Sequence, residues 1–218
     1  MTIDDAGLEP LHVRAYEVSA FRLSEAEILL RGRVRDTKPA GLYIADDPEP
    51  MVIHNMTVDL VVKLPGMEIT GAEVAFHVNP HEQCPTIIGH YDKLVGLSIA
   101  RGFTHKVRDL FGGPRGCTHT SALLQAMAPV AIQCIWSMQA SSSASASQDV
   151  HITRTKPSPE QRMAMFAFNL NTCHVWDEDG AQVALVQSGE TPGPPLWATR
   201  RMAELGIDPA EWEARMRR

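Results

Sequence analysis

Cysteine and histidine residues recur beside the starts of predicted helices, where a sulfur or an imidazole can do chemistry. Cys84 is followed by Pro85 and a helical pattern, and Cys117 follows a loop with three glycines and precedes the longest helical pattern. Unpaired N–H groups and the positive dipole end of a helix favour a thiolate at such places. His119 is expected in the first turn of the same helix, where it could share a ligand with Cys117 or donate a proton beside it. Free cysteines are also common as small core residues, so structural packing is the competing interpretation of each sulfur.

Further histidines could complete such a site from loop ends. His81 lies three residues before Cys84, and His54 precedes a predicted strand. Cys173 and His174 form another pair in a predicted strand, where neighbouring side chains point to opposite faces, so at most one of them should face a given site. A solvated side chain is the alternative for each lone loop histidine.

Basic residues surround the glycine-rich loop before Cys117. Lys106, Arg108 and Arg115 could hold a carboxylate or phosphate group of a substrate there, and a solvated helix face is the alternative. The sequence contains no dinucleotide-binding, P-loop, nucleophile-elbow or zincin motif, and no close-spaced pair of cysteines of the zinc-ribbon kind. These absences disfavour the corresponding enzyme classes.

The first part of the chain, up to Pro80, is predicted to form strands. β-branched and aromatic residues alternate over 15–21, 27–34, 56–64 and 69–78, and Pro65-Gly66 is predicted to join the last two as a hairpin. After Pro80, apolar residues recur at helical spacing over 87–95, over 103–111 and over a long segment from near Thr118. Pro129 should kink or divide that long helix, and the Ser-rich run 140–149 is expected to be a flexible loop.

The last third of the chain has weaker patterns. Residues 172–186 are predicted to form a hairpin, 189–195 a loop, and the end two short helices, the second opening at Asp208-Pro209. The fold class is therefore α+β: an antiparallel sheet from the N-terminal half packs against helices, including a long central one, with a C-terminal hairpin and helices. We expect a single domain over 1–188 and a C-terminal loop and helical extension over 189–218.

The amino-acid composition indicates which partners and which cell compartment to expect. The chain has 218 residues, 44% of them hydrophobic, and 20 basic against 26 acidic residues give a net charge of −6. An acidic balance disfavours nucleic-acid partners. No apolar run approaches the roughly 18 residues that span a bilayer, and the acidic start is unlike a signal peptide, so we expect a cytoplasmic protein without a membrane partner. Four cysteines in a reducing compartment are expected to be free.

The chain resembles a bacterial family known as domain of unknown function 2889, over about residues 36–180. The motifs that carry the resemblance are DTKP (36–39), IHNM (53–56), ITGAEVAF (69–76), PHEQC (80–84), LVGLSIARGF (94–103), GGPRGCTHTSALL (112–124) and NTCHVWDEDG (171–180). Thr120 replaces the usual leucine after the Gly-Cys-Thr-His signature, a change expected to alter packing below the site. The family name implies no activity.

The chain is more distantly similar to iron–sulfur scaffold proteins of the NifU and IscU type. Their order of motifs implies a NifU- or SufE-like core in which Cys84 follows the last strand and Cys117 lies at a late helix. In this alignment His54 replaces the first scaffold cysteine, and Gly116 replaces the histidine of the His-Cys pair. The resemblance therefore implies a mixed site of His54, Cys84, Cys117 and His119, which suits zinc or a single iron.

These residues lead us to expect a metal-dependent enzyme, a lyase or hydrolase, that acts on a small organic molecule in bacterial catabolism. A divalent zinc or iron ion would keep one coordination position open, and His81 or His119 would transfer protons. The alternatives are a metal or iron–sulfur delivery protein without turnover, a thiol-based enzyme, and a structural or assembly protein. The expected partner is the small-molecule substrate, and a homodimer is left open.

Overall fold

The structure is a computed structural model of the chain, and it describes residues 4, 6–146, 158–167, 169–190, 193–208 and 211. The chain divides into two compact units, Met1–Met138 and Gln139–Arg218, and each is described by itself. The domain boundary predicted near residue 188 stays a prediction.

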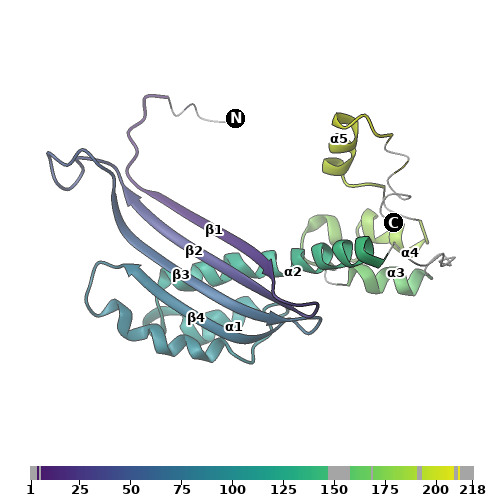
Figure 1. The fold of residues 1–218 in the computed structure, drawn as a ribbon, viewed down its shortest axis with the longest axis horizontal. Coiled ribbons are helices and arrows are strands. Elements are labelled where there is room, and N and C mark those ends of the chain that lie inside the picture. The colour runs from purple at the N-terminus through teal and green to yellow at the C-terminus, as the bar shows by residue number, and fades with distance from the viewer. Residues whose placement is uncertain are drawn as a thin grey trace. The chain divides into compact units, whose positions relative to one another are not determined.

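The first unit is built on a four-stranded antiparallel sheet (Figure 1). Its strands lie in chain order and are β1 (Val13–Arg22), β2 (Glu27–Lys38), β3 (Met51–Lys63) and β4 (Glu68–Val78). The predicted strands and the hairpin turn at Pro65-Gly66 are thereby confirmed. β3 begins five residues earlier than the alternating pattern predicts, so His54 lies inside this strand and not before it.

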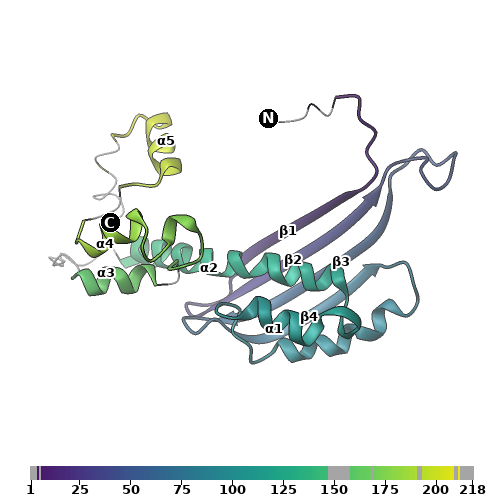
Figure 2. The same ribbon diagram turned by 180° about the vertical axis from the view of Figure 1, so that it is seen from behind.

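Helices cover one face of the sheet (Figure 2). They are the 3-10 helix η1 (Cys84–Leu94), α1 (Phe103–Phe111), the short 3-10 helix η2 (Gly113–Arg115) and α2 (Thr118–Ala146). The predicted α+β class, with the sheet in the N-terminal half and a long helix, is confirmed.

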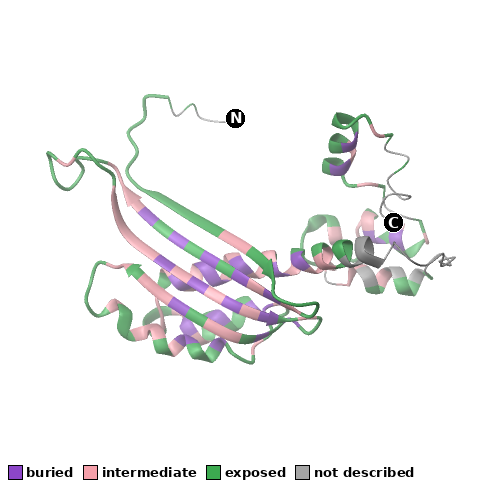
Figure 3. Ribbon diagram, viewed as in Figure 1, coloured by how far each residue is buried: buried purple, intermediate pink, exposed green. Residues whose placement is uncertain are grey.

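The core lies between this sheet face and α2. Burial alternates along β2, where Ile28, Leu30 and Val34 are buried and the alternate residues are half-buried (Leu29) or exposed (Arg31 and Arg33) (Figure 3). Gly32 belongs to the same row, and a Cβ atom there would lie 2.7 Å from Met127 Sδ of α2. The absence of a side chain at this position therefore lets the helix pack directly on the strand.

The apolar character of α2 is explained by this packing. Its segment Thr118–Ser141 has the length and composition of a membrane span. Its buried row of Leu123, Leu124, Met127 and Ala131, however, belongs to the core of the first unit. These residues place the first half of α2 in a folded core.

Two expectations about α2 need correction. The helix is one element through Pro129, so it is not divided there, whereas the expected kink stays a prediction. The helix also includes residues 140–146 of the predicted loop, and residues 147–149 lie outside the described ones. Pro129 is exposed, so the backbone acceptor that it leaves unpaired can be hydrated. The alternating alanines of the Ser-rich run are strong helix formers, which explains why the helix continues.

The second unit is helical over the residues described. It contains α3 (Pro159–Phe166), the 3-10 turn η3 (His174–Trp176), α4 (Ala181–Gln187) and α5 (Leu196–Glu204). The hairpin predicted over 172–186 is wrong, because Val183 and Val186 are buried at helical spacing. The second C-terminal helix, predicted from Asp208-Pro209, lies mostly outside the described residues.

Candidate metal centre

A buried carboxylate lies at the end of the inward-facing row of β2. Asp36 continues the alternation of Ile28, Leu30 and Val34, and its side chain is only 1% exposed. The strand register places Arg14 of β1 opposite it on one side and His54 of β3 opposite it on the other. Directly opposite residues of antiparallel strands share a face. The three polar side chains therefore form one row across the sheet.

Arg14 holds the carboxylate in a two-pronged ion pair. Its Nε donates to Asp36 Oδ1 at 2.6 Å, and its Nη2 donates to Oδ2 at 2.7 Å. This pairing, opposed by desolvation, holds the pKa of the Asp36 carboxyl well below its usual range. The same contact raises the pKa of the guanidinium. Asp36 is therefore a fixed negative charge inside the protein.

Two imidazoles meet at the same carboxylate oxygen. His54 Nδ1 and His119 Nε2 each lie 3.1 Å from Asp36 Oδ2, and the two ring centroids are 3.8 Å apart. A third imidazole, that of His12, lies 3.4 Å from Oδ1. Burial, with the charges of His54 and Arg14, lowers the pKa of His119. His119 is thus the neutral imidazole that metal binding requires.

The start of α2 is fixed so that His119 reaches Asp36. The Cys117 backbone N–H donates to the hydroxyl of Tyr91 at 2.8 Å, and the buried Tyr91 ring stacks on Phe111 at 4.8 Å. A Cβ atom on Gly116 would lie 2.4 Å from the Phe111 carbonyl oxygen, so glycine is needed there. Burial raises the pKa of Tyr91 and keeps its phenol protonated.

The spacing of these groups fits a metal ion. Ligand atoms of Asp36, His54 and His119 all lie within 4.8 Å of one another. Ligands about 2.0–2.1 Å from a tetrahedral zinc lie roughly 3.3 Å apart, close to the 3.1 Å from Oδ2 to each imidazole nitrogen. Two imidazoles and a carboxylate suit zinc or iron. Arg14 would orient the ligating carboxylate from behind, as outer partners of metal ligands do.

Cys117 lies on the far side of the His119 ring. Its Sγ is 3.6 Å from Nδ1, the nitrogen that is not directed at Asp36. The sulfur, the ring and the carboxylate form a chain Cys117–His119–Asp36. If Nε2 of His119 held a metal, Nδ1 would carry the proton and could donate it to the sulfur, so Cys117 would orient a ligand; its predicted role as a direct ligand stays a prediction.

Cys84 and His81 lie apart from this cluster in the part of the chain that the structure describes. Cys84 is half-buried and lies at the start of a helix, as expected, but this helix is the 3-10 helix η1 and Cys84 is its first residue. His81 is exposed, and its backbone carbonyl accepts from the Cys84 N–H at 3.0 Å. The described group of side chains that could share an ion includes neither residue.

Arg108 and Arg115 were predicted to bind a substrate, but the contacts of Arg115 are with the backbone of α1. Arg115 donates to the carbonyls of Asp109 at 2.9 Å and Arg108 at 3.2 Å, which caps the end of α1. The side chains of Arg108 and Lys106 are exposed on that helix. Their role in binding a substrate stays a prediction.

Cys173 and His174 belong to the second unit. Both are exposed, Cys173 as the residue before η3 and His174 as its first residue. They do not lie in the predicted strand. Any role of theirs in a site also stays a prediction.

Sequence reasoning missed Asp36, Arg14 and His12 as members of the cluster. Asp36 had a detectable signal: it falls at the next inward position after three alternating apolar residues of β2. An ionisable side chain at an inward position needs a partner. Arg14 had no such signal, because charged residues on an exposed edge strand are common, and His12 had none because it lies just before that strand.

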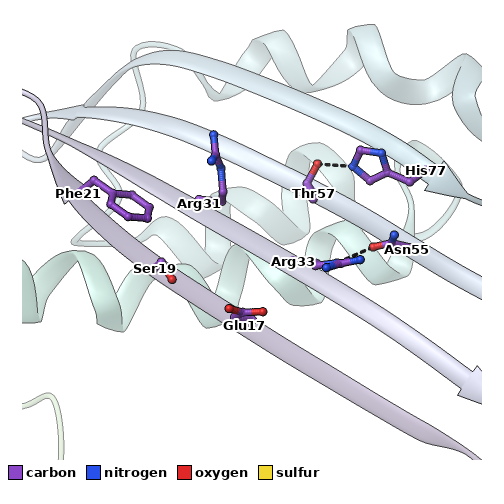
Figure 4. Close-up of a pocket in the computed structure, with 8 residues that line it drawn as sticks. All are labelled: Glu17, Ser19, Phe21, Arg31, Arg33, Asn55, Thr57 and His77. Carbon is purple, nitrogen blue, oxygen red and sulfur yellow. Dashed lines mark hydrogen bonds between the residues drawn. The ribbon is translucent and has the colours of Figure 1, made fainter.

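The opposite face of the sheet carries a separate hollow of about 600 Å³ (Figure 4). It is lined by Glu17, Ser19, Phe21, Arg31, Arg33, Asn55, Thr57 and His77. Arg33 donates to Asn55 at 2.8 Å, and Thr57 lies 2.9 Å from His77. Arg31 and Arg33 alternate with the inward residues of β2, so this hollow does not open onto Asp36. All of its lining residues except Phe21 are polar types, as on the solvated face of an antiparallel sheet.

Comparisons with known proteins identify a family and no activity. A family model described as a protein of unknown function (DUF2889) matches residues 12–133. The match includes every member of the cluster from His12 to His119, begins before the resemblance predicted from residue 36, and ends before 180. No curated protein and no solved structure matches the chain. The similarity to NifU- and IscU-type scaffolds stays a prediction.

Proposed function

This chain belongs to the DUF2889 family of proteins of unknown function, and we propose that it is a metal-dependent enzyme acting on a small organic molecule. Asp36, His54 and His119 would hold one divalent ion, zinc or iron. The observation that carries this proposal is the convergence of two imidazole nitrogens on one oxygen of a buried, ionised carboxylate. This set replaces the mixed cysteine–histidine set expected from the sequence.

A lyase or hydrolase step suits this donor set. Three protein ligands leave one coordination position for water or substrate, and such an ion acts as a Lewis acid when bound. As a metal ligand His119 would give Nε2 to the ion, with Nδ1 beside Cys117, and would then not be available to carry protons to or from a substrate. We assign proton transfer to His12, whose side chain is 35% exposed and 3.4 Å from Asp36 Oδ1.

Burial supports a resident ion over a delivered one. A delivery protein needs ligands that an acceptor can reach, whereas Asp36 is 1% exposed and is locked by Arg14. An enzyme that keeps its ion between turnovers is consistent with this enclosure. We propose that the enzyme works in the cytoplasm.

Metal content is the direct test. Protein purified without chelator should contain close to one zinc or iron per chain by elemental analysis. His54→Ala and His119→Ala should each remove it, whereas Cys84→Ala and the matched control His77→Ala, on the opposite sheet face, should retain it. Metal-free wild type, or equal metal in the two ligand variants, would overturn the proposal.

A thiol-based enzyme is the second candidate, supported by the chain of contacts from Cys117 through His119 to Asp36. A sulfur beside an imidazole that is oriented by a carboxylate is the arrangement of an activated nucleophile. This candidate predicts that metal-free Cys117 reacts with iodoacetamide faster than the exposed Cys173, and that His119→Ala slows only Cys117. Equal rates for the two sulfurs would exclude it.

A further inference from the structure

The outer side of the cluster presents a cation to solvent. Arg14 uses Nε and Nη2 on Asp36, yet 37% of its side chain is exposed. The fork leaves further N–H donors of the guanidinium for a ligand. Tyr16, two residues along the same strand, also interacts with this guanidinium. Arg14 therefore faces both the buried carboxylate and the space outside it.

Apolar side chains lie at the same end of the sheet. β1 begins, β2 ends and β3 begins at this end, and the β2–β3 connection extends from it (Figure 1). The connection exposes Leu42, Tyr43 and Ile44, and the segment before β1 exposes Leu11. We call these four residues the apolar rim. Such a cluster of exposed apolar groups beside polar ones is typical of a binding surface.

Lys38 ties the two parts of the apolar rim together. Its Nζ donates to the Leu11 carbonyl at 3.4 Å and lies 5.7 Å from the centroid of the Tyr43 ring. Lys38 is two residues from Asp36, and Leu11 is three residues from Arg14. The cation Lys38 and the four apolar side chains therefore come from the chain segments next to Arg14 and Asp36, at the end of the sheet where β1 begins and β2 ends.

We infer that this site takes a small monocarboxylate with an apolar body, whose carboxylate pairs with Arg14 and whose body lies against the apolar rim. Arginine pairs with carboxylates through parallel N–H donors, and an apolar wall with a few polar groups is the usual lining of a small-molecule site. The inference rests on the proposed function for the reaction that follows binding. The binding itself needs only Arg14 and the rim.

Hexanoate, its neutral analogue hexanamide and the short carboxylate acetate test both halves of the inference. Calorimetric titrations use full-length protein, once metal-free and once loaded with zinc. Hexanoate should bind about tenfold more tightly than either other probe, which corresponds to about 1.4 kcal/mol. Arg14→Gln should abolish the preference for hexanoate over hexanamide. The matched control Arg35→Gln, an exposed arginine on the opposite face of β2, should retain it.

A second variant avoids the buried ion pair altogether. Leu42→Ser combined with Tyr43→Ser should reduce the preference for hexanoate over acetate and leave acetate binding unchanged. Equal binding of hexanoate and hexanamide by wild type, or selectivity unchanged in Arg14→Gln, would overturn the inference. So would a wild-type dimer that this double variant converts to a monomer, because the rim would then be covered by a second copy of the chain.

The two proposals fail separately. Wild type that binds no metal but still selects hexanoate would overturn the proposed function and support the inference. Wild type that binds one metal per chain without carboxylate selectivity would overturn the inference alone.

Discussion

Replacing Asp36 with asparagine removes the charge on which the candidate centre is built. Two charge-assisted hydrogen bonds from Arg14 end on this carboxylate, and each such bond contributes about 1.5–3 kcal/mol. Asparagine retains one acceptor oxygen and turns an NH₂ group toward a donor. Arg14 recovers part of its hydration because its side chain is 37% exposed. We therefore expect a loss of about 2–3 kcal/mol, below the roughly 3–5 kcal/mol of a fully buried pair.

The opposite sheet face offers a matched control. Arg31 and Asp59 form a similar fork, with an Nη2–Oδ2 distance of 2.6 Å, but their side chains are 55% and 24% exposed. Exposed ion pairs contribute about 1 kcal/mol or less. Asp59→Asn should therefore cost clearly less than Asp36→Asn, although it removes the same chemical group from the same sheet.

Urea unfolding of metal-free protein at pH 7 measures both losses. The gap between wild type and Asp36→Asn should also shrink as pH falls below about 4, near the usual aspartate pKa. The folded-state pKa of Asp36 is lowered, so the unfolded chain takes up the proton first and stability falls with pH. Equal losses for Asp36→Asn and Asp59→Asn, or a gap that does not change in acid, would refute the reasoning.

Three further predictions concern the surroundings of the centre. As the pH falls below about 6.5 the metal-free protein should lose stability, because the unfolded chain protonates His119 at its usual pKa whereas burial lowers that pKa in the fold. Urea unfolding at a series of pH values should show a shallower dependence on pH for His119→Gln. Gly32→Ala should lower the free energy of unfolding in urea by about 1–3 kcal/mol, since its Cβ would lie 2.7 Å from Met127 Sδ. Gly71→Ala is the control, because the nearest atom to its Cβ lies at 3.4 Å. A smaller loss for Gly32→Ala than for Gly71→Ala would contradict the prediction. The Cβ atom of Gly116→Ala would lie 2.4 Å from the backbone oxygen of Phe111 in α1 and would displace the start of α2. We therefore expect this variant to lose its metal in elemental analysis. Full metal content would disprove this.

Local periodicity was sufficient to place the four strands and the starts of the helices that cover them, although not the first residue of β3 or the end of α2. Alternation marks a strand because its side chains point to opposite faces in turn, and Pro65-Gly66 marks the turn between β3 and β4 by its own backbone preferences. The same local reasoning failed over 172–186. Valines at short spacing there suit a strand or a helix, and burial of Val183 with Val186 on one face decided for the helix.

The sequence by itself also identified His54, Cys117 and His119 as residues able to do chemistry, because their side chains are rare and reactive wherever they lie. The sequence alone did not show that His54 and His119 contact the same residue, Asp36. Asp36 meets Arg14, His54 and His119 across separations of 22, 18 and 83 residues. These contacts depend on the register of three strands and on the place where α2 begins above them. An aspartate or an arginine is ordinary on a surface, and only packing that buries Asp36 turns these residues into one charged centre, since a carboxylate removed from water must be paired.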